Sequence, residues 1–440
     1  MKDIIQRAKA LDEEYTIFNS IADTVEIEGS GRLEKVAVSV KDNICTRGMQ
    51  TTAGSRILEG YVPPFDATVV EKCRGEGAFI IGKTTQDEFG FGTFNVNTPF
   101  GVPRNPHDAG RSCGGSSGGA ACLTAVADFP HLAIAESTGG SISCPAAFCG
   151  VVGLTPTYGR TSRWGLVDYA NSLDKVGCMG KTVGEAALLL SVISGPDEYD
   201  STVLQAPEED FTRFLVDSVD GLSIGVPGEY FPEGLDPGIS KHVLGAIDRL
   251  EELGALIREV SLPHTSVALS SYYVIAIAEA STNLAKYCGL RYGLHLPLEG
   301  NFDDYFARVR ARGFSEEAKR RIILGTFARM AGYRDAYYLK ALRVRTRVIE
   351  DFKRAFREVD VIATPTMPVV APRFDEIEAM EPIQQYMMDV LTVAPNLAGI
   401  PMISVPCGRV EGLPVGLHLM ADHLQEGDII RAAHAYEVSR

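Results

Sequence analysis

Three short segments in the first third of the chain carry lysine and serine side chains that could break an amide bond. Lys41 follows the β-branched run Val36–Val40, Ser116 lies within the glycine-rich run Gly114–Gly119, and Ser141 ends a Ser-Thr-Gly-Gly-Ser segment. Amide cleavage needs an activated nucleophile, a proton relay to the departing amine, and hydrogen-bond donors for the oxyanion. The three segments contain residue types suited to each of these parts.

The segment before Ser141 is suited to binding an oxyanion. Its backbone N–H groups, those of Thr138, Gly139, Gly140 and Ser141 itself, can converge because glycine lets the chain curl around a small oxygen. A lysine can replace histidine as the base only where burial lowers its pKa towards neutrality. Ser116 would then lie between the lysine and Ser141 and pass the proton. Residue types alone are equally compatible with ordinary turns and a lysine on the surface.

Two other matches to catalytic motifs are rejected because of their context. Gly77–Thr84 fits the phosphate-binding pattern G-x-x-x-x-G-K-[ST], but its spacer is a predicted apolar strand, whereas a phosphate cradle needs an open loop. Gly115–Gly119 fits the G-x-S-x-G nucleophile elbow, which must join a strand to a helix. The preceding Arg104–Cys113 is predicted to be a loop, and none of the eight histidines lies in a context typical of the required base.

The elements that would position these segments alternate between strands and helices. Short β-branched or apolar runs predict strands, and apolar residues at helical spacing predict helices. The predicted strands are Val36–Val40, Ala78–Ile81, Leu222–Val226, Ala255–Val260, Val359–Ala363 and Met402–Val405, and the clearest helices are Ala67–Arg74, Ile239–Leu253 and Tyr338–Phe356. This rhythm is typical of an α/β fold. Because no linker or repeat divides the chain, we expect one domain over residues 1–440, with a mainly helical insertion at about 265–357.

Composition excludes several classes of protein. The formal charge is −15, with 42 basic and 57 acidic residues and no block of Lys and Arg, which argues against direct nucleic-acid binding as the main activity. The nine cysteines are scattered without a C-x-x-C pair, so neither a disulfide framework nor a metal site is predicted. We expect no signal peptide, because the first residues mix acids and bases without an apolar core, and no apolar run reaches the roughly 20 residues that a membrane span needs. We therefore expect a soluble, cytoplasmic protein without membrane contact.

Several of these motifs resemble the amidase signature family in order and approximate spacing. They are Lys41-Asp-Asn43, Gly114–Gly119, Thr138–Ser141, Pro145–Gly150, Gly153–Arg160 and Val359–Pro365. The resemblance covers essentially the whole chain and implies the amidase signature fold, a central mixed β-sheet covered by helices on both faces. It also implies a Ser–cis-Ser–Lys triad, with Ser141 as nucleophile, Ser116 as the bridging serine at a cis peptide, and Lys41 as base.

Within this family, further segments resemble the A, or glutaminase, subunits of tRNA-dependent amidotransferases. They are Val40–Gly48, Gly165–Val167, Ser172–Val176, Ala278–Leu284, Arg291–Gly293, Arg320–Gly325, Asp389–Val393 and Asn396–Gly399. The resemblance implies that the chain hydrolyses glutamine and passes ammonia to a partner B subunit, with a small C subunit, which converts Glu-tRNA(Gln) or Asp-tRNA(Asn) to Gln-tRNA(Gln) or Asn-tRNA(Asn). No cofactor is expected in this chain, because ATP, Mg²⁺ and misacylated tRNA would bind to the partner.

The same resemblance implies a pocket for the zwitterionic end of glutamine. Arg321 would hold the α-carboxylate, Asp389 the α-ammonium, and Tyr272 would line the pocket. The chemistry fits, because a zwitterion needs one fixed cation and one fixed anion, and arginine offers two parallel N–H groups to a carboxylate. Without the resemblance, Arg321 fits a solvated helix face beside Lys319 and Arg320.

The chain departs from the family pattern next to the proposed nucleophile. The family usually has Asp-Thr-Gly-Gly-Ser-Ile-Arg, whereas here serine replaces both the acid (Ser137) and the arginine (Ser143), and His418 stands where glutamine is common. We hypothesise that the acid and the arginine form an ion pair that was lost as a unit. Two alternatives to a glutaminase subunit stay open: a stand-alone amidase for small carboxamides, and a scaffold subunit whose catalysis has decayed.

Overall fold

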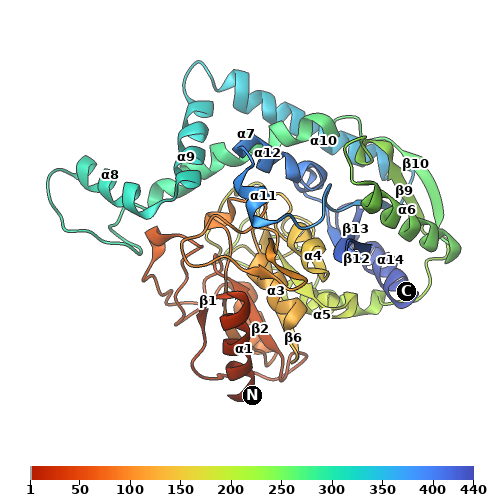
Figure 1. Ribbon diagram of the computed structural model, residues 1–440, viewed down its shortest axis with the longest axis horizontal. Coiled ribbons are helices and arrows are strands. Elements are labelled where there is room, and N and C mark those ends of the chain that lie inside the picture. Colours follow the sequence, from red (N-terminus) through yellow and green to blue (C-terminus); the bar gives the residue numbers. More distant parts are fainter. Residues whose placement is uncertain (1) are drawn as a thin grey trace.

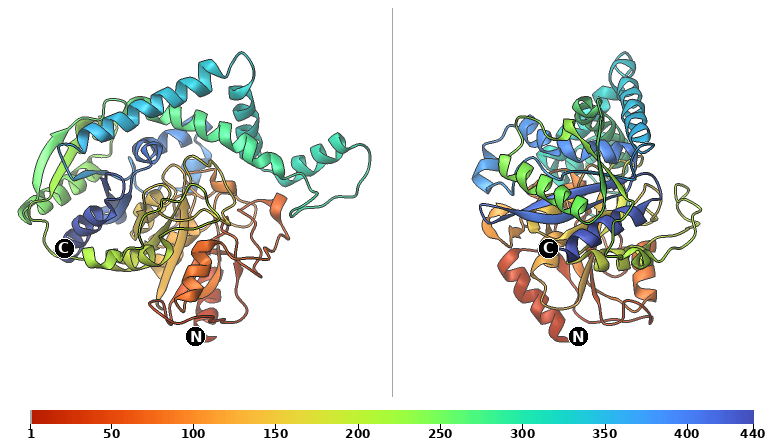
Figure 2. Two further views of the ribbon diagram at one scale, coloured as in Figure 1. Left: turned by 180° about the vertical axis from the view of Figure 1, so that it is seen from behind. Right: turned by 90° about the vertical axis from the view of Figure 1, so that its right-hand side faces the viewer.

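The computed structural model describes residues 2–440 and is built around one large mixed sheet (Figures 1 and 2). The sheet has 11 strands in the order β1-β3-β2-β6-β8-β7-β12-β13-β11-β9-β10. Its strands are β1 (Phe18–Ile21), β2 (Ala37–Lys41), β3 (Phe79–Thr84), β6 (His131–Ser137), β7 (Val152–Thr155), β8 (Lys175–Gly180), β9 (Ser223–Pro227), β10 (Leu256–Val260), β11 (Val361–Pro365), β12 (Met402–Val410) and β13 (Leu413–Ala421). β2 is parallel to β3 and β6, β9 is parallel to β10 and β11, and the other neighbours are antiparallel.

Helices cover both faces of this sheet, and the two faces alternate along the strands. In β2, Val38 packs into the larger apolar core whereas Ala37 packs into a second core on the opposite face, and Ile134 and Ala133 of β6 divide in the same way. This period of two is the pattern of a sheet buried on both sides. The α/β class and the mixed, two-sided sheet predicted from the sequence are confirmed.

The helices range in length from the five residues of α11 to the 19 residues of α7. They are α1 (Lys2–Tyr15), α2 (Thr68–Gly75), α3 (Gly118–Val126), α4 (Ser143–Cys149), α5 (Val183–Ile193), α6 (Pro237–Glu252), α7 (Thr265–Asn283), α8 (Phe302–Gly313), α9 (Glu316–Arg329), α10 (Lys340–Ala355), α11 (Phe374–Glu378), α12 (Pro382–Met387), α13 (Val393–Ala398) and α14 (Glu426–Val438). Short single turns of 3₁₀-helix include η2 (Glu88–Gly90) and η7 (Met388–Leu391). No helix within residues 2–440 is both long enough and apolar enough to cross a membrane.

The strands and helices predicted from local pattern are present with small shifts at their ends. β2, β3, β9, β10, β11 and β12 correspond to the six predicted strands, and α2, α6 and α10 to the three helices. α6 begins where Asp236 accepts hydrogen bonds from the N–H groups of Gly238 and Ile239, with Pro237 in the first turn. The predicted loop at Arg104–Cys113 is wrong, because this segment forms a small hairpin of β4 (Arg104–Asn105) and β5 (Asp108–Ser112).

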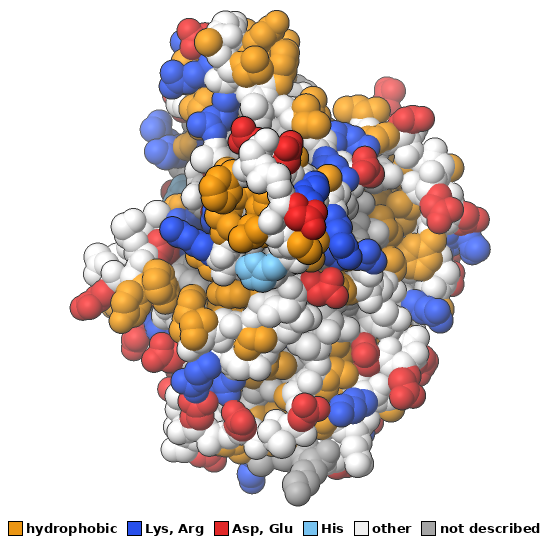
Figure 3. All heavy atoms as spheres, turned by 90° about the vertical axis from the view of Figure 1, so that its left-hand side faces the viewer, with side chains coloured by type: hydrophobic (Ala, Val, Ile, Leu, Met, Phe, Trp, Pro, Cys, Tyr) orange, Lys and Arg blue, Asp and Glu red, His pale blue; other side chains and the backbone are white. Residues whose placement is uncertain are grey.

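Residues between α7 and α10 are mainly helical and lie along one side of the sheet. α7 packs against α9, α10 and α13, and Figure 1 shows α8 projecting from the body at the far end of this segment. The turn after α9 carries an exposed aromatic cluster, in which the ring centroids of Phe327 and Tyr333 are 4.3 Å apart and those of Phe327 and Tyr337 5.9 Å apart. Figure 3 shows apolar side chains gathered at the upper end of the face on which this segment lies.

The sheet topology brings the predicted catalytic segments to one edge. β2 and β6 are parallel neighbours, with Val40 opposite Ile134, so their carboxyl ends lie side by side. Lys41 is the last residue of β2, and the loop that contains Ser141 directly follows β6. The carboxyl ends of parallel strands are where α/β proteins place their sites.

Candidate active site

The amino group of Lys41 lies in a fully buried position at the end of β2. Lys41 and Ser116 are both 0% exposed. The Nζ of Lys41 donates to Ser116 Oγ at 2.7 Å, and to the carbonyl oxygen and the carboxylate Oε2 of Glu136 at 2.9 Å each. The structure therefore excludes Lys41 as a surface residue and brings two of the three predicted catalytic side chains into direct contact.

The loop that carries Ser116 is packed closely against its surroundings. The Gly115–Ser116 peptide bond is cis. The N–H of Gly115 donates to the carbonyl of Thr93 at 2.6 Å, and a Cβ on Gly115 would lie 2.2 Å from a carboxylate oxygen of Asp87, so only glycine fits there. Although a hairpin precedes this loop, Ser116 contacts a lysine in place of the histidine that a nucleophile elbow requires. The elbow interpretation remains rejected.

The P-loop match is also excluded by the position of its lysine. Gly82, Lys83 and Thr84 continue the strand β3 and do not form an open loop. Lys83 is 0% exposed, and its Nζ donates to the carbonyl of Ile44 and to Thr51 Oγ1. A lysine held in this way inside the sheet cannot reach a phosphate.

Ser141 lies on the loop between β6 and α4 and is 7% exposed, unlike the sealed Lys41 and Ser116. The N–H of Gly140 donates to Ser137 Oγ at 3.2 Å, whereas within residues 2–440 the N–H groups of Thr138, Gly139 and Ser141 have no acceptor. Within the same residues the Ser141 hydroxyl has no hydrogen-bond partner, and catalytic hydrogen bonds are often long until substrate binds. Ser141 is thus partly accessible and lies on a loop with three N–H groups that have no acceptor, one of which is its own.

The two glycines of this loop are in contact with the segments that carry the predicted substrate pocket. A Cβ on Gly139 would lie 2.4 Å from the ring of Tyr272 in α7, and a Cβ on Gly140 would lie 2.3 Å from Thr392 Oγ1. Thr392 in turn donates to the carbonyl of Asp389 at 3.2 Å. The predicted pocket residues Tyr272 and Asp389 therefore come from elements that lie directly against the loop of Ser141.

Arg321 is buried in a cage of aromatic rings. It is 3% exposed, and the centroids of four rings lie 4.9 to 5.8 Å from its Cζ: those of Phe91, Tyr169, Tyr273 and Tyr386. Its Nε donates to Glu317 Oε1 at 2.7 Å and its Nη1 to Tyr169 Oη at 2.6 Å, while Nη2 has no acceptor within residues 2–440. The guanidinium is thus fixed in orientation with one edge free, and the interpretation of Arg321 as a solvated residue is wrong.

Asp389 lies on the other side of Tyr273 from Arg321. Its Oδ2 accepts from Tyr273 Oη at 2.6 Å and its Oδ1 from Thr93 Oγ1 at 2.9 Å. Burial raises the pKa of Asp389 to about 6, against the opposing effects of these hydrogen bonds and of the Arg321 charge. Arg321 and Asp389 form no direct ion pair within residues 2–440, because Arg321 is paired with Glu317.

The two serines that depart from the family pattern have separate partners. Ser137 accepts from the N–H of Gly140, and the Ser143 hydroxyl lies 3.2 Å from His418 Nε2. Ser143 and His418 are both 0% exposed, and burial lowers the pKa of His418 to about 3, so the imidazole is neutral. An arginine at position 143 would therefore meet a neutral, closed environment.

Replacing only Ser143 with arginine is expected to destabilise the protein more than replacing Ser137 with aspartate and Ser143 with arginine together. A single buried charge without a partner costs about 3 to 5 kcal/mol, whereas the double variant restores both members of the proposed pair. Thermal unfolding of Ser143→Arg, Ser137→Asp and the double variant checks this. A double variant that melts at or below the temperature of Ser143→Arg would contradict the ion-pair hypothesis.

Several residues of the site were not found by sequence reasoning. Tyr169, Tyr273 and Tyr386 form the cage around Arg321 but lie in segments far apart in the chain. Glu317 precedes Arg321 by four residues on α9, a spacing at which a carboxylate and a guanidinium meet, so the pair was detectable. Glu136 was detectable as well, since it is an acid at the end of an apolar strand next to Ser137.

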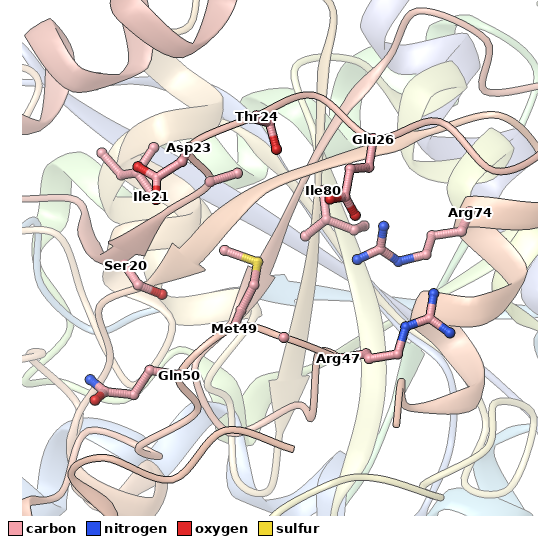
Figure 4. Close-up of a pocket in the computed structure, with 12 residues that line it drawn as sticks. Ser20, Ile21, Asp23, Thr24, Glu26, Arg47, Met49, Gln50, Arg74 and Ile80 are labelled. Carbon is pink, nitrogen blue, oxygen red and sulfur yellow. The ribbon is translucent and has the colours of Figure 1, made fainter. Parts of the chain in front are cut away.

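A depression elsewhere on the surface is unrelated to this site. It has a volume of 320 Å³ and is lined by residues of β1 and of the loop after Cys45 (Figure 4). Arg47 and Arg74 project towards it, but both guanidinium groups are paired with Glu28 and Asp66. It shares no residue with the catalytic segments.

Comparison with known proteins is consistent with this geometry. The chain is 50% identical over 410 residues to the A subunit of glutamyl-tRNA(Gln) amidotransferase from Methanococcoides burtonii, covering 93% of this chain and 86% of that protein. It is 51% identical to the protein of the same name from Carboxydothermus hydrogenoformans, over 93% of this chain and 84% of that one. Among solved structures, the A subunit of the same enzyme from Thermotoga maritima superposes with a TM-score of 0.85 at 38% identity, covering 99% of this chain and 91% of that one.

More distant relatives share the fold. The peptide amidase of Stenotrophomonas maltophilia has a TM-score of 0.76 at 30% identity and covers 93% of this chain and 83% of its own. The family model described as amidase matches residues 2–430. From this match and from relatives about half identical over most of its length, the chain belongs to the amidase family.

Proposed function

We propose that the chain is the glutaminase subunit of a tRNA-dependent amidotransferase and that Ser141, Ser116 and Lys41 form its catalytic triad. The observation that carries the substrate assignment is the pair of fixed, opposite charges, Arg321 and Asp389, which both contact Tyr273, the neighbour of the Tyr272 that lies against the loop of Ser141. A simple carboxamide offers nothing for these charges to bind. The α-carboxylate and α-ammonium of glutamine would satisfy both.

The reaction proceeds by acyl transfer. As Ser141 Oγ attacks the side-chain carbonyl of glutamine, its proton passes to Ser116 while the Ser116 proton passes to Lys41. The oxyanion is held by the free N–H groups of Thr138, Gly139 and Ser141. The proton then returns through Ser116 to the departing nitrogen, ammonia leaves, and water hydrolyses the glutamyl ester by the same relay in reverse.

The charge-bearing pocket positions glutamine for this attack. Nη1 and Nη2 of Arg321 each retain a free N–H group, and such a pair can bind one carboxylate, while Glu317 and Tyr169 hold the guanidinium in place. The Asp389 carboxylate, oriented by Tyr273 and Thr93, receives the α-ammonium. Holding the substrate at both charges fixes the side-chain amide relative to Ser141, which is how binding contributes to rate.

The ammonia acceptor and its cofactors belong to partner subunits in this proposal. A B subunit, with a small C subunit, would bind ATP, Mg²⁺ and tRNA misacylated with Glu or Asp. The relatives named as A subunits of an amidotransferase support an assembly of more than one subunit. The exposed cluster of Phe327, Tyr333 and Tyr337 at the end of α9 is a surface of the kind that a partner covers.

The test measures ammonia release from glutamine and from a simple aliphatic carboxamide, with the Ser141→Ala protein as blank. Each assay is run with and without cell extract that supplies partner subunits and charged tRNA. Selective release from glutamine that rises with extract supports the proposal. Equal or faster release from the simple amide, indifferent to extract, identifies a stand-alone amidase. No release in either condition, together with no labelling of Ser141 by a fluorophosphonate, identifies a scaffold subunit.

The KM for glutamine is expected to rise as the pH falls through about 6. Burial raises the pKa of Asp389 to about 6, so below that pH the carboxyl is protonated and no longer attracts the α-ammonium. Initial rates between about pH 5 and pH 8 measure this. The Asp389→Asn variant is the control: its KM should be high at every pH and lack the acidic rise. A wild-type KM that stays constant over this range would contradict the assignment of Asp389.

A further inference from the structure

Glu136 is a buried carboxylate beside the base, and the relay described above gives it no part. It is 1% exposed and lies at the end of β6, immediately before the loop of Ser141. Two of its oxygens, the backbone carbonyl and Oε2, are each 2.9 Å from Lys41 Nζ. A charge pair removed from water is stable only with good geometry and further hydrogen bonds.

Those further hydrogen bonds are present on the carboxylate of Glu136. Its Oε2 also accepts from Asn43 Nδ2 at 3.2 Å, and its Oε1 lies 2.8 Å from Thr138 Oγ1. The carboxylate thus accepts from three donors on two different segments: Lys41 and Asn43 at the end of β2, and Thr138 after β6. Donors of this kind favour the ionised form of a buried acid.

The neighbouring acid Asp174 completes this arrangement in its neutral form. Thr138 Oγ1 is also 2.8 Å from Asp174 Oδ1, yet a hydroxyl has a single hydrogen to donate. One of the two carboxyl groups must therefore carry a proton. Burial raises the pKa of Asp174 well above its ordinary range, and the charge of Glu136 raises it further. Asp174 then donates to Thr138, which donates to a charged Glu136.

The geometry around Lys41 gives Glu136 an orienting role. A protonated Lys41 directs its three N–H groups at Ser116 Oγ and at the two oxygens of Glu136. When Lys41 loses a proton, the two Glu136 oxygens still hold the remaining N–H groups, so the lone pair faces Ser116. A base with its lone pair already directed at the proton donor needs no reorientation before transfer.

We propose that Glu136 is a fourth, positioning member of the relay, which directs the lone pair of Lys41 at Ser116 and neutralises the ammonium that forms there. The proposal rests on the triad assigned under the proposed function. Glu136 itself gains and loses no proton during the cycle. The proton from Ser141 reaches Lys41 through Ser116, resides there beside the negative carboxylate, and returns to the leaving ammonia.

Two other acids, Asp174 and Asp87, lie near the Lys41–Glu136 pair, and the choice of variants separates their effects from that of Glu136. Asp174 faces it through Thr138 from the segment before β8. Asp87 faces Lys41 from the segment before η2, and burial raises the pKa of Asp87 to about 7, opposed by the N–H groups of Asn97 and Asn95 and by Lys41. Because Asp87 titrates in the same range, the test compares matched variants in which Asp87 is unchanged.

The test is the pH dependence of kcat at saturating glutamine in Glu136→Gln, with Asp174→Asn as the matched control; kcat is used because protonation of Asp389 is expected to change KM. Both variants replace a buried carboxyl by an amide of the same shape, but only the first removes a negative charge from Lys41. In Glu136→Gln we expect the acid limb to move to lower pH by about one to three units, with a lower maximal rate. The acid limb of Asp174→Asn should stay in place. An unmoved limb in Glu136→Gln, or equal shifts in both variants, would overturn the proposal.

A second readout separates this inference from the proposed function. The protein is labelled with ¹³Cε-lysine, and the Lys41 resonance is assigned by its absence in Lys41→Met. The chemical shift of this resonance should change at lower pH in Glu136→Gln than in the wild type. This result does not depend on whether glutamine is the substrate. If the wild-type protein hydrolyses glutamine as proposed but this chemical-shift change does not move in Glu136→Gln, the role of Glu136 is overturned while the proposed function stands. If Glu136→Gln does not fold, Glu136→Asp keeps the charge but withdraws it from Nζ, and should move both readouts in the same direction by a smaller amount. No movement in Glu136→Asp overturns the proposal.

Discussion

Replacing Ser141 with alanine is expected to reduce ammonia release from glutamine by at least about 10⁴-fold. Ser141 is the only one of the three proposed triad side chains with an exposed surface, at 7%, and it adjoins three N–H groups without acceptors. Removing its hydroxyl leaves the relay and the oxyanion donors in place but takes away the atom that forms the acyl bond. The fold should be unaffected, because within residues 2–440 the hydroxyl makes no hydrogen bond that would be lost.

Steady-state ammonia release, intact-protein mass spectrometry after fluorophosphonate treatment, and thermal unfolding together check this. Ser143→Ala is the matched control, since Ser143 lies two residues further on, is also buried, and within residues 2–440 its hydroxyl has a hydrogen-bond partner only in His418. The Ser143→Ala variant should still be labelled by the fluorophosphonate and should keep nearly all of the wild-type activity. Substantial hydrolysis by Ser141→Ala, or labelling that persists in it, would show that another residue is the nucleophile.

Replacing Arg321 with methionine is expected to lower kcat/KM for glutamine by about 10²- to 10³-fold, while release from propionamide stays nearly constant. Removing one partner of a buried charge pair typically costs about 3 to 5 kcal/mol, and about 1.4 kcal/mol corresponds to tenfold. The α-carboxylate of glutamine would face the aromatic cage without a cation. Propionamide has no carboxylate, so its binding does not depend on Arg321.

Two further variants distinguish recognition from structural damage. Arg320→Met removes the neighbouring arginine, which also pairs with Glu317 but has a side chain 41% exposed, and should leave glutamine hydrolysis almost unchanged. Arg321→Lys keeps a positive charge but not the planar pair of N–H groups, so it should recover only part of the activity. Equal losses for glutamine and propionamide in Arg321→Met would argue for a stand-alone amidase.

The aromatic cage explains why arginine is more suitable than lysine at position 321. Four rings within 5.8 Å of its Cζ leave the guanidinium little water, and a planar cation stacks on such faces better than a compact ammonium does. Burial alone would disfavour a cation here. The pairing with Glu317 and the rings around it compensate for the lost water, and the free Nη2 edge is available to a second anion.

Local patterns in the sequence were sufficient to single out the residues that are proposed to react. Lys41 at the end of a β-branched run, and the two glycine-rich segments, are features of a few consecutive residues, and the structure places Lys41 against Ser116 as expected. Strands with β-branched side chains, such as β2 and β11, were found for the same reason. β6 and β8 were not predicted, because alanine in β6 and glycine in β8 interrupt their larger apolar residues and both strands carry charged residues.

The tertiary structure alone decided what surrounds these residues. Hydrogen bonds across the sheet brought β6 beside β2, which put the carboxylate of Glu136 against Lys41 although 95 residues separate them. The cage around Arg321 draws on Phe91, Tyr169, Tyr273 and Tyr386, which no spacing relates. Long-range contacts of this kind depend on strand order and helix packing, whereas a sequence pattern reports only the preferences of neighbours. The sequence therefore indicated which groups are proposed to react, and the fold determined the charges and the rings that surround them.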